Sequence, residues 1–167
     1  MATKTDFSST EWDVLRDTPL LVVLAMAAAG GSGLFGSIAE AIAPSGTIIE
    51  ALKGSNQLLK EVCEKEEMMA SIESIKSLTK TRGDFAGIQA ALRKEATDKA
   101  RSALDLLRQK GSPEDIAAYR DFLIKLGDKV ANAAKEGAFL GFGGERVSEH
   151  ERTLLAELAE AVGALQA

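Results

Sequence analysis

The sequence predicts an all-α protein, a single-domain helical bundle of about six to seven helices. The chain has 167 residues, 46% of them apolar and 27% charged, which suits one soluble domain. It contains only three prolines and is rich in the helix formers Ala, Leu, Glu and Lys. Apolar residues recur at three- and four-residue steps along most of its length. We expect residues 8–167 to form the domain and residues 1–7 to be a flexible N-terminal tail.

The first helix has a clear start. Ser8 and Glu11 have the spacing of a capping box, in which the two side chains satisfy free backbone N–H groups at the helix start. Phe7 and Trp12 stand where a hydrophobic staple is expected. The pattern predicts a short helix over residues 9–16.

A second start follows at Thr18 and Pro19. Threonine is a good N-cap, and proline at the first helical position needs no N–H. Residues 19–29 are apolar on all sides, which indicates a buried central helix, and Gly30 is expected to end it. Two separate helices are therefore predicted between residues 9 and 29.

The middle of the chain carries two long amphipathic patterns. A short helix near residues 38–42 is expected to end at Pro44, and a long helical pattern then runs to a break at residues 81–83. Its apolar stripe consists of Ile48, Leu52, Leu59, Val62, Met69, Ile72 and Ile75. After the cap Asp84, the next stripe consists of Phe85, Ile88, Leu92, Ala96, Ala100, Ala103 and Leu107. Each stripe predicts the apolar face of a helix.

Two further helices are predicted in the last third. Ser112, Pro113 and two first-turn acids open the first, whose stripe consists of Ile116, Tyr119, Leu123, Leu126, Val130 and Ala133. Ser148 and Glu151 form another capping box and open the second, whose stripe consists of Leu155, Leu158, Val162 and Leu165.

Two glycine-rich segments resemble each other. Their shared features are glycines and a phenylalanine after an Ala-rich run, and the residues concerned are Gly30, Gly31, Gly33, Phe35 and Gly36 in the first segment and Gly137, Gly141, Phe142, Gly143 and Gly144 in the second. A shift of 107 residues also aligns Trp12 with Tyr119 and Val23 with Val130. The echo predicts an internal two-fold duplication; the alternative is convergence, since glycine commonly follows a helix.

The first segment also contains the letters of a dinucleotide-binding fingerprint, from Gly31 to Gly36. That function requires a strand before the loop, for which residues 20–24 are the candidate, and an acid further on, for which Glu50 is the candidate. Residues 25–29 favour helix, however, and no later segment supplies further parallel strands. These features disfavour the fingerprint, so a nucleotide-binding enzyme is the less favoured alternative function.

Composition limits the chemistry. A net charge of −5 argues against nucleic acid as a partner, because phosphate binding needs a basic face. Cys63 is the one cysteine, so it forms no intrachain disulfide, and its place in a helical pattern favours packing over reactivity. We assign no catalytic residue and no cofactor.

The chain's one histidine lies among acids at the start of the last predicted helix. Glu145, Glu149, His150 and Glu151 offer carboxylate and imidazole ligands, which makes a divalent metal the one cofactor to consider. The alternative is an ordinary solvated helix start, because first-turn acids favour the helix dipole and Glu151 also belongs to the capping box.

Residues 147–151, followed by Leu154, Leu155 and Leu158, resemble the TerB-like helical family, which is associated with tellurite resistance and bacterial stress. The resemblance implies two helical halves, each with a buried Ala-rich helix and an acidic, metal-binding turn. This chain departs from the family at that turn, where it has Gly30 and Gly31 in one copy and Gly143 and Gly144 in the other. The implied oxygen ligands are then limited to Glu145, Glu149 and Glu151.

These observations favour a non-enzymatic binding or self-assembly protein of the bacterial cytoplasm, of scaffold or stress-associated type. Its expected partner is itself or another protein, with no nucleic acid and no membrane. The uncharged stretch at residues 20–39 is rich in Ala, Gly and Ser and is preceded by acids, which does not suit a membrane span. A metal-binding stress protein of TerB type is the alternative.

Overall fold

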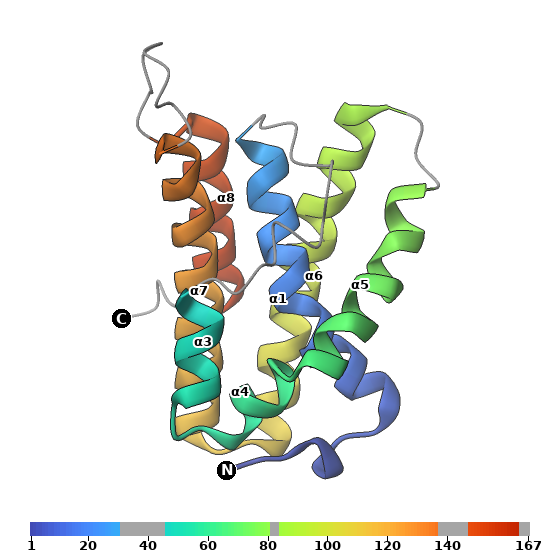
Figure 1. The fold of residues 1–167 in the computed structure, drawn as a ribbon, viewed down its shortest axis with the longest axis vertical. Helices are drawn as coiled ribbons and strands as arrows, with labels where there is room; N and C mark the ends of the chain where they lie inside the picture. Colours follow the sequence, from blue (N-terminus) through green and yellow to red (C-terminus); the bar gives the residue numbers. More distant parts are fainter. Residues whose placement is uncertain (31–45, 81–83, 137–146, 164–167) are drawn as a thin grey trace.

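Seven α-helices and one short 3-10 turn make up the described part of the chain. The computed structural model describes residues 1–30, 46–80, 84–136 and 147–163, and these residues contain no strand. The longer helices run roughly along one common axis (Figure 1). The prediction of an all-α, single-domain bundle is confirmed. Within these residues, no helix combines the length and the hydropathy that a bilayer span requires.

One continuous helix, α1 (Ser9–Ala29), takes the place of the two helices predicted over this stretch. It starts as predicted: Ser8 and Glu11 form the capping box, and the rings of Phe7 and Trp12 lie 6.2 Å apart between centroids. The predicted restart at Thr18 and Pro19 is wrong, because Pro19 lies inside the helix.

Helix α1 passes through Pro19 because the tertiary structure satisfies the carbonyl that proline leaves free. Proline has no N–H, so the carbonyl of Leu15, four residues earlier, loses its helical partner. The hydroxyl of Tyr119 on α7 (Pro113–Glu136) donates a 2.6 Å hydrogen bond to that carbonyl. Tyr119 is fully buried, so this bond joins α1 and α7 in the core.

Helix α1 lies at the centre of the bundle. Around it pack α5 (Lys65–Lys80), α6 (Phe85–Lys110) and α7, while α8 (Glu149–Ala161) packs against α6 and α7 (Figure 1). The α6 face towards the core carries the fully buried alanines Ala96, Ala100 and Ala103. Small side chains at a helix contact let the two axes approach closely, which places α1 against α6 along much of its length.

Residues 46–80 form three helices where the sequence predicts one long pattern. These are α3 (Gly46–Lys53), α4 (Gln57–Val62) and α5. Asn56 starts α4, because its side-chain oxygen accepts a 3.0 Å hydrogen bond from the backbone N–H of Leu59. The chain therefore changes direction before α4 and again at Cys63 and Glu64, which no apolar periodicity indicates.

The changes of direction divide the predicted stripe. Leu52 and Met69 are turned outward, with exposed fractions of 42% and 59%. Phe85, at the start of α6, is likewise 46% exposed, although the sequence places it on the apolar face. Four residues of the stripe predicted over residues 48–75 are buried: Ile48, Leu59, Val62 and Ile75.

A buried carboxylate joins three segments at one end of the bundle. Asp115 is fully buried, and its Oδ2 accepts hydrogen bonds from the backbone N–H of Ala2 at 2.8 Å and from the Ser112 N–H at 3.0 Å and Oγ at 2.8 Å. Its Oδ1 accepts a 2.9 Å bond from the Asn56 side chain. The N-terminal segment, the start of α4 and the start of α7 therefore share one acceptor group.

The N-terminal residues are held more closely than the predicted flexible tail. Ala2 and Phe7 are buried, and the backbone N–H of Lys4 donates a 2.6 Å hydrogen bond to Glu61. Lys4 to Asp6 form the 3-10 turn η1. Residues 2–7 thus lie against the end of the bundle where α4 and α7 begin.

The remaining predicted helix starts agree with the structure. Asp84 caps α6, since its Oδ1 accepts the N–H of Gly87 at 2.8 Å, and Ser148 caps α8. The short helix predicted near residues 38–42, the break at residues 81–83, Leu165 and the side chain of Ala133 lie outside the described residues. The predicted duplication also stays a prediction, because both glycine-rich segments lie outside them except for Gly30.

Candidate functional site

The predicted metal ligands are distributed over the surface and interior of the start of α8. Glu149 and His150 are exposed, whereas Glu151 is buried and its Oε2 accepts hydrogen bonds from the Ser148 N–H at 2.7 Å and Oγ at 2.8 Å. Glu145 lies outside the described residues. Across the part of the chain that the structure describes, no three acidic, histidine or cysteine side chains are grouped to hold a metal. The metal site stays a prediction that depends on Glu145.

Glu151 also explains the glycine at the end of α1. Gly30 has φ −72° and ψ −3°, which any residue adopts, so its backbone does not require glycine. A Cβ added there would lie 2.7 Å from Glu151 Oε1. A methyl group at position 30, where the end of α1 meets the start of α8, would therefore fit only if the Glu151 side chain moved.

We expect Gly30→Ala to lower the free energy of unfolding by about 1 kcal/mol, because the methyl group displaces Glu151 and weakens the cap of α8. Chemical denaturation of the purified protein measures the change. At a position with this backbone conformation and free space, the same substitution is expected to stabilise by about 0.4–1 kcal/mol. A stabilised Gly30→Ala variant contradicts the contact.

The requirements of the dinucleotide fingerprint are not met where the structure describes them. Residues 20–24, the candidate strand, are helical and form the middle of α1. Glu50, the candidate ribose ligand, lies on α3 and pairs with Lys125. The loop from Gly31 to Gly36 itself lies outside the described residues.

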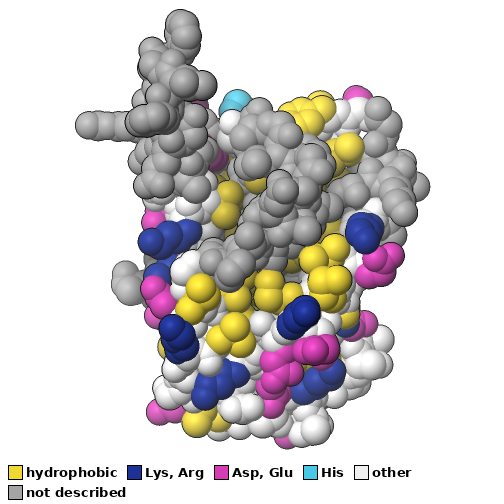
Figure 2. Space-filling model, viewed as in Figure 1, with side chains coloured by type: hydrophobic (Ala, Val, Ile, Leu, Met, Phe, Trp, Pro, Cys, Tyr) yellow, Lys and Arg dark blue, Asp and Glu magenta, His cyan; other side chains and the backbone are white. Residues whose placement is uncertain are grey.

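An apolar cavity lies between α1, α3, α5 and α7, and the end of α4 contributes to its lining. It has a volume of about 270 Å³. Most of its lining is carbon, and the side chains that form it are Arg16, Pro19, Leu20, Val23, Ile48, Val62, Cys63, Met68, Ser71, Phe122, Leu126, Lys129 and Val130. Hydrophobic side chains also gather in the middle of the face drawn in Figure 2. A concave site of this kind, mostly apolar with few polar groups, is what small-molecule sites share.

Ser71 is the unusual polar group in this lining. It is 1% exposed, and its Oγ has no hydrogen-bond partner among the residues that the structure describes. A serine inside a helix usually donates to a carbonyl one turn earlier or points to solvent. Since Ser71 does neither, it leaves a donor unused at the wall of an apolar cavity.

Ser71→Ala is expected to raise the free energy of unfolding of the ligand-free protein by about 1 kcal/mol or more, because it removes a buried donor without a partner. Urea denaturation of the two proteins side by side measures it. The matched control Ser102→Ala, on the exposed face of α6, is expected to change stability much less. A loss of stability in Ser71→Ala shows that the hydroxyl has a partner in solution.

Two cations, Arg16 and Lys129, line the cavity. Arg16 Nη1 lies 2.7 Å from Asp13 Oδ1, and its Nε lies 2.8 Å from Asp17 Oδ1. On the other side, a hydrogen bond from Lys125 and its charge hold the pKa of Glu50 below its ordinary value, and Lys129 adds to this effect. Arg16 is therefore already paired with carboxylates, whereas Lys129 is exposed to solvent.

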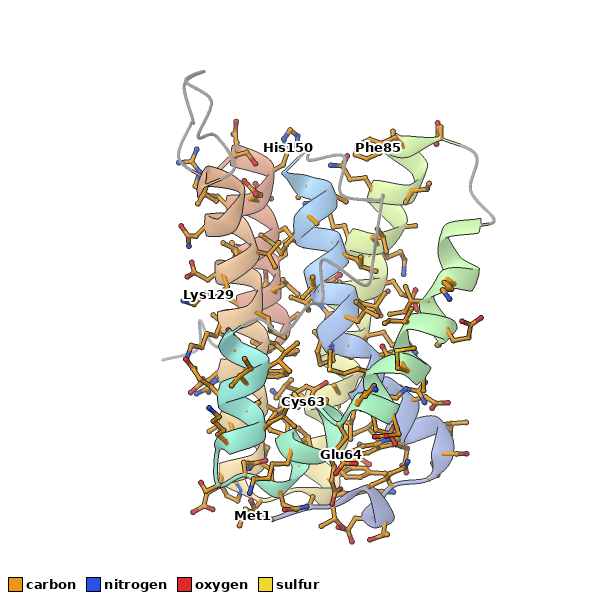
Figure 3. The ribbon with its side chains drawn as sticks, in the orientation of Figure 1. Met1, Cys63, Glu64, Phe85, Lys129 and His150 are labelled. Atoms are coloured by element: carbon orange, nitrogen blue, oxygen red, sulfur yellow. The ribbon has the colours of Figure 1, made fainter. Side chains whose placement is uncertain are left out.

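Cys63 contributes a thiol to the same lining. It follows α4, is 3% exposed, and lies inside the bundle in Figure 3. Burial raises the pKa of its thiol to about 12, because the thiolate is poorly solvated there. The structure thus agrees with the prediction of a packed, weakly reactive cysteine.

At pH 8 we expect iodoacetamide to alkylate Cys63 at least about a hundredfold more slowly in the folded protein than in urea, because little thiolate forms. Mass spectrometry of timed samples gives the rates. Between pH 8 and pH 11 the folded-state rate should keep rising with pH, provided that circular dichroism shows the fold intact. A plateau near pH 9 shows an ordinary, accessible thiol.

A second, more polar groove of about 430 Å³ lies between α1, α6 and α8, with His150 at its edge. Arg93 and Glu157 form an ion pair across it, and Gln89 Nε2 donates a 2.7 Å hydrogen bond to the carbonyl of Ala28. His150 lies at the end of the molecule opposite Met1 in Figure 3. These polar contacts hold α6 against α1 and α8, so we assign the groove a structural role.

Comparison with known proteins adds no family assignment: no family model, no curated protein and no solved structure matches this chain.

The sequence did not reveal the cavity. The residues that line it come from five elements. In the sequence, Ser71 resembles any other serine on an amphipathic helix. Two weak signals were present: Pro19 inside an apolar run, and Ser71 among apolar neighbours on α5. Neither indicates a cavity until the neighbouring helices are placed.

Proposed function

We propose that this protein is a non-enzymatic binding protein that takes a small apolar molecule into the cavity between α1, α3, α5 and α7. One observation supports the proposal above all: an apolar cavity of about 270 Å³ between helices of the bundle. The spaces between the helices of a bundle are frequent sites for ligands. The proposal assigns no catalytic residue.

An uncharged fluorescent dye tests this function. N-phenyl-1-naphthylamine gains fluorescence in apolar surroundings, so we expect a saturable increase on titration with the folded protein and none with the urea-unfolded chain. The volume of the cavity, equal to that of about nine waters at roughly 30 Å³ each, favours small probes. The absence of saturable binding by both the dye and smaller apolar probes contradicts the function.

A matched pair of substitutions on α1 locates the binding. Val23 lines the cavity, whereas Val14 lies at a shallow groove on another face of the same helix. Val23→Trp is expected to fill the cavity and reduce dye affinity at least about tenfold, which corresponds to roughly 1.4 kcal/mol. Val14→Trp is expected to leave it unchanged, and circular dichroism verifies that both variants fold. Equal effects in the two variants place the dye elsewhere.

Self-association is a second candidate, supported by the outer face of α3. Ile49 and Leu52 lie three residues apart on that helix and are 36% and 42% exposed. We expect the protein to sediment as a homo-oligomer at tens of micromolar, and Leu52→Lys to dissociate it. Gln57→Lys, at the nearby start of α4, is the charge-matched control. A monomeric parent protein contradicts this candidate.

The proposals for family, location and partners rest on the sequence. We propose a divergent relationship to the TerB-like family, because an all-helical fold and the Ser148 to Glu151 cap are compatible with it. We also propose a place in the bacterial cytoplasm, with no nucleic acid as a partner, in line with the net charge of −5. Metal binding through Glu145 and its neighbours is tested by a thermal shift with calcium or zinc that His150→Ala combined with Glu151→Ala abolishes.

A further inference from the structure

The unused hydroxyl of Ser71 specifies the ligand more closely than the cavity volume does. Ser71 is 1% exposed and lines the cavity, and within the described part of the chain its hydroxyl has no hydrogen-bond partner. A hydroxyl buried in an apolar environment is costly unless it is hydrogen-bonded. A ligand that carries a hydrogen-bond acceptor supplies the missing partner, whereas a pure hydrocarbon leaves the hydroxyl unsatisfied.

The charges around the cavity argue against an anionic ligand. Arg16 is held by Asp13 and Asp17, and the Oδ2 of Asp17 also accepts a 2.9 Å hydrogen bond from Ser74. On the opposite wall, Lys129 is exposed and shares the neighbourhood of Glu50 with Lys125. A buried carboxylate needs an ion pair as well as hydrogen bonds. Among the described lining residues Arg16 is already paired, and Lys129 is exposed to solvent, which weakens its attraction for an anion.

We infer that the cavity binds an uncharged apolar molecule with one hydrogen-bond acceptor, such as a ketone or ester oxygen, which accepts a hydrogen bond from Ser71 Oγ. This inference rests on the proposed function, since it names the ligand class of that same cavity. The carbon lining made by Leu20, Val23 and Leu126 holds the hydrocarbon part, and Ser71 orients the polar atom.

Two probes of the same shape test the acceptor. In 2-octanone a carbonyl oxygen stands where 2-methyl-1-octene has a methylene group, so the pair differs mainly in hydrogen bonding. Displacement of bound N-phenyl-1-naphthylamine gives the affinity of each probe for the parent protein and for Ser71→Ala. We expect Ser71→Ala to reduce the affinity for 2-octanone by about tenfold, the size of one lost hydrogen bond. The affinity for 2-methyl-1-octene is expected to stay the same or to increase.

The control variant is Ser102→Ala on α6. It is expected to leave the affinity for both probes unchanged, because Ser102 does not line this cavity. Octanoate tests charge: we expect it to compete more weakly than 2-octanone at pH 8. Stronger competition by octanoate, weakened by Lys129→Met, overturns the assignment of an uncharged ligand.

The outcomes separate this inference from the proposed function. If the dye binds and Val23→Trp blocks it, but Ser71→Ala affects both probes equally, the cavity binds ligands without using Ser71 and the inference is wrong. If neither dye nor probes bind the parent protein, the proposed function fails as well. Binding that appears only when Leu34 and Phe35 are changed to serine shows that the chain's own residues 31–45 occupy the cavity, and this overturns both.

Discussion

Replacing Asp115 by alanine is expected to lower the free energy of unfolding by about 3 kcal/mol or more. The substitution removes a charged carboxylate that accepts several hydrogen bonds. Three of the four donors are held in place by other structure: the N–H of Ala2, the side chain of Asn56 and the N–H of Ser112. They lose their partner at a site that is fully buried in the folded protein. Chemical denaturation followed by circular dichroism measures the loss.

Two variants make the Asp115 experiment specific. Asp115→Asn keeps the shape and one acceptor oxygen, so we expect it to recover part of the stability. Asp121→Ala, on the exposed face of the same helix, removes a surface carboxylate paired with Arg120 and is expected to cost less than about 1 kcal/mol. A similar loss in Asp115→Ala and Asp121→Ala shows that the buried hydrogen bonds are unimportant.

The Asp115 carboxylate also makes the stability of the fold depend on pH. Burial alone raises the pKa of Asp115, but hydrogen bonds from Ser112, Ala2 and Asn56 outweigh it, so the folded-state pKa is below the ordinary value of 3.8. A group with a lowered folded-state pKa stabilises the fold above its unfolded pKa and loses this contribution as the pH falls through the folded pKa. The difference in stability between the parent protein and Asp115→Ala is therefore expected to be full at pH 6 and to shrink below about pH 4.

The second large effect is expected at Tyr119. Tyr119→Phe leaves the Leu15 carbonyl without its 2.6 Å partner and is expected to cost about 1–3 kcal/mol. Burial raises the pKa of Tyr119, so its hydroxyl stays protonated and able to donate. The carbonyl needs this donor because Pro19 has no N–H.

A double-mutant cycle tests whether Tyr119 compensates for Pro19. In a Pro19→Ala background the backbone N–H at position 19 returns to Leu15, so Tyr119→Phe is expected to cost about 1 kcal/mol less than in the parent protein. Thr97→Val on α6 serves as the control, because the Thr97 hydroxyl donates to the carbonyl of Arg93 one turn earlier in its own helix. Strict additivity of Tyr119→Phe and Pro19→Ala contradicts the compensation.

Local sequence signals predicted the helix starts well. The capping boxes at Ser8 and Ser148 and the cap at Asp84 depend on residues three apart, and each forms as expected. The apolar stripe of α6 was likewise correct after its first residue, Phe85. Such signals are reliable because a cap and a helix face involve neighbours along the chain, whose geometry the helix itself sets.

Two of the errors involve partners far away in sequence. Pro19 looks like a helix start until Tyr119 is known to accompany it, and Asn56 looks like an ordinary polar residue until it caps α4 beside Asp115. In each case a local pattern allowed two outcomes, and a tertiary contact selected one.

The sequence by itself determined the fold class and the positions of most helix starts, since these depend on composition and short-range spacing. The continuity of α1 and the division of residues 46–80 into three helices were decided by the tertiary structure. The cavity, in which the Ser71 hydroxyl has no partner among the described residues, was also decided by the tertiary structure. The physical reason is that burial and hydrogen-bond satisfaction belong to the packed assembly of helices, so they appear only when distant segments are brought together.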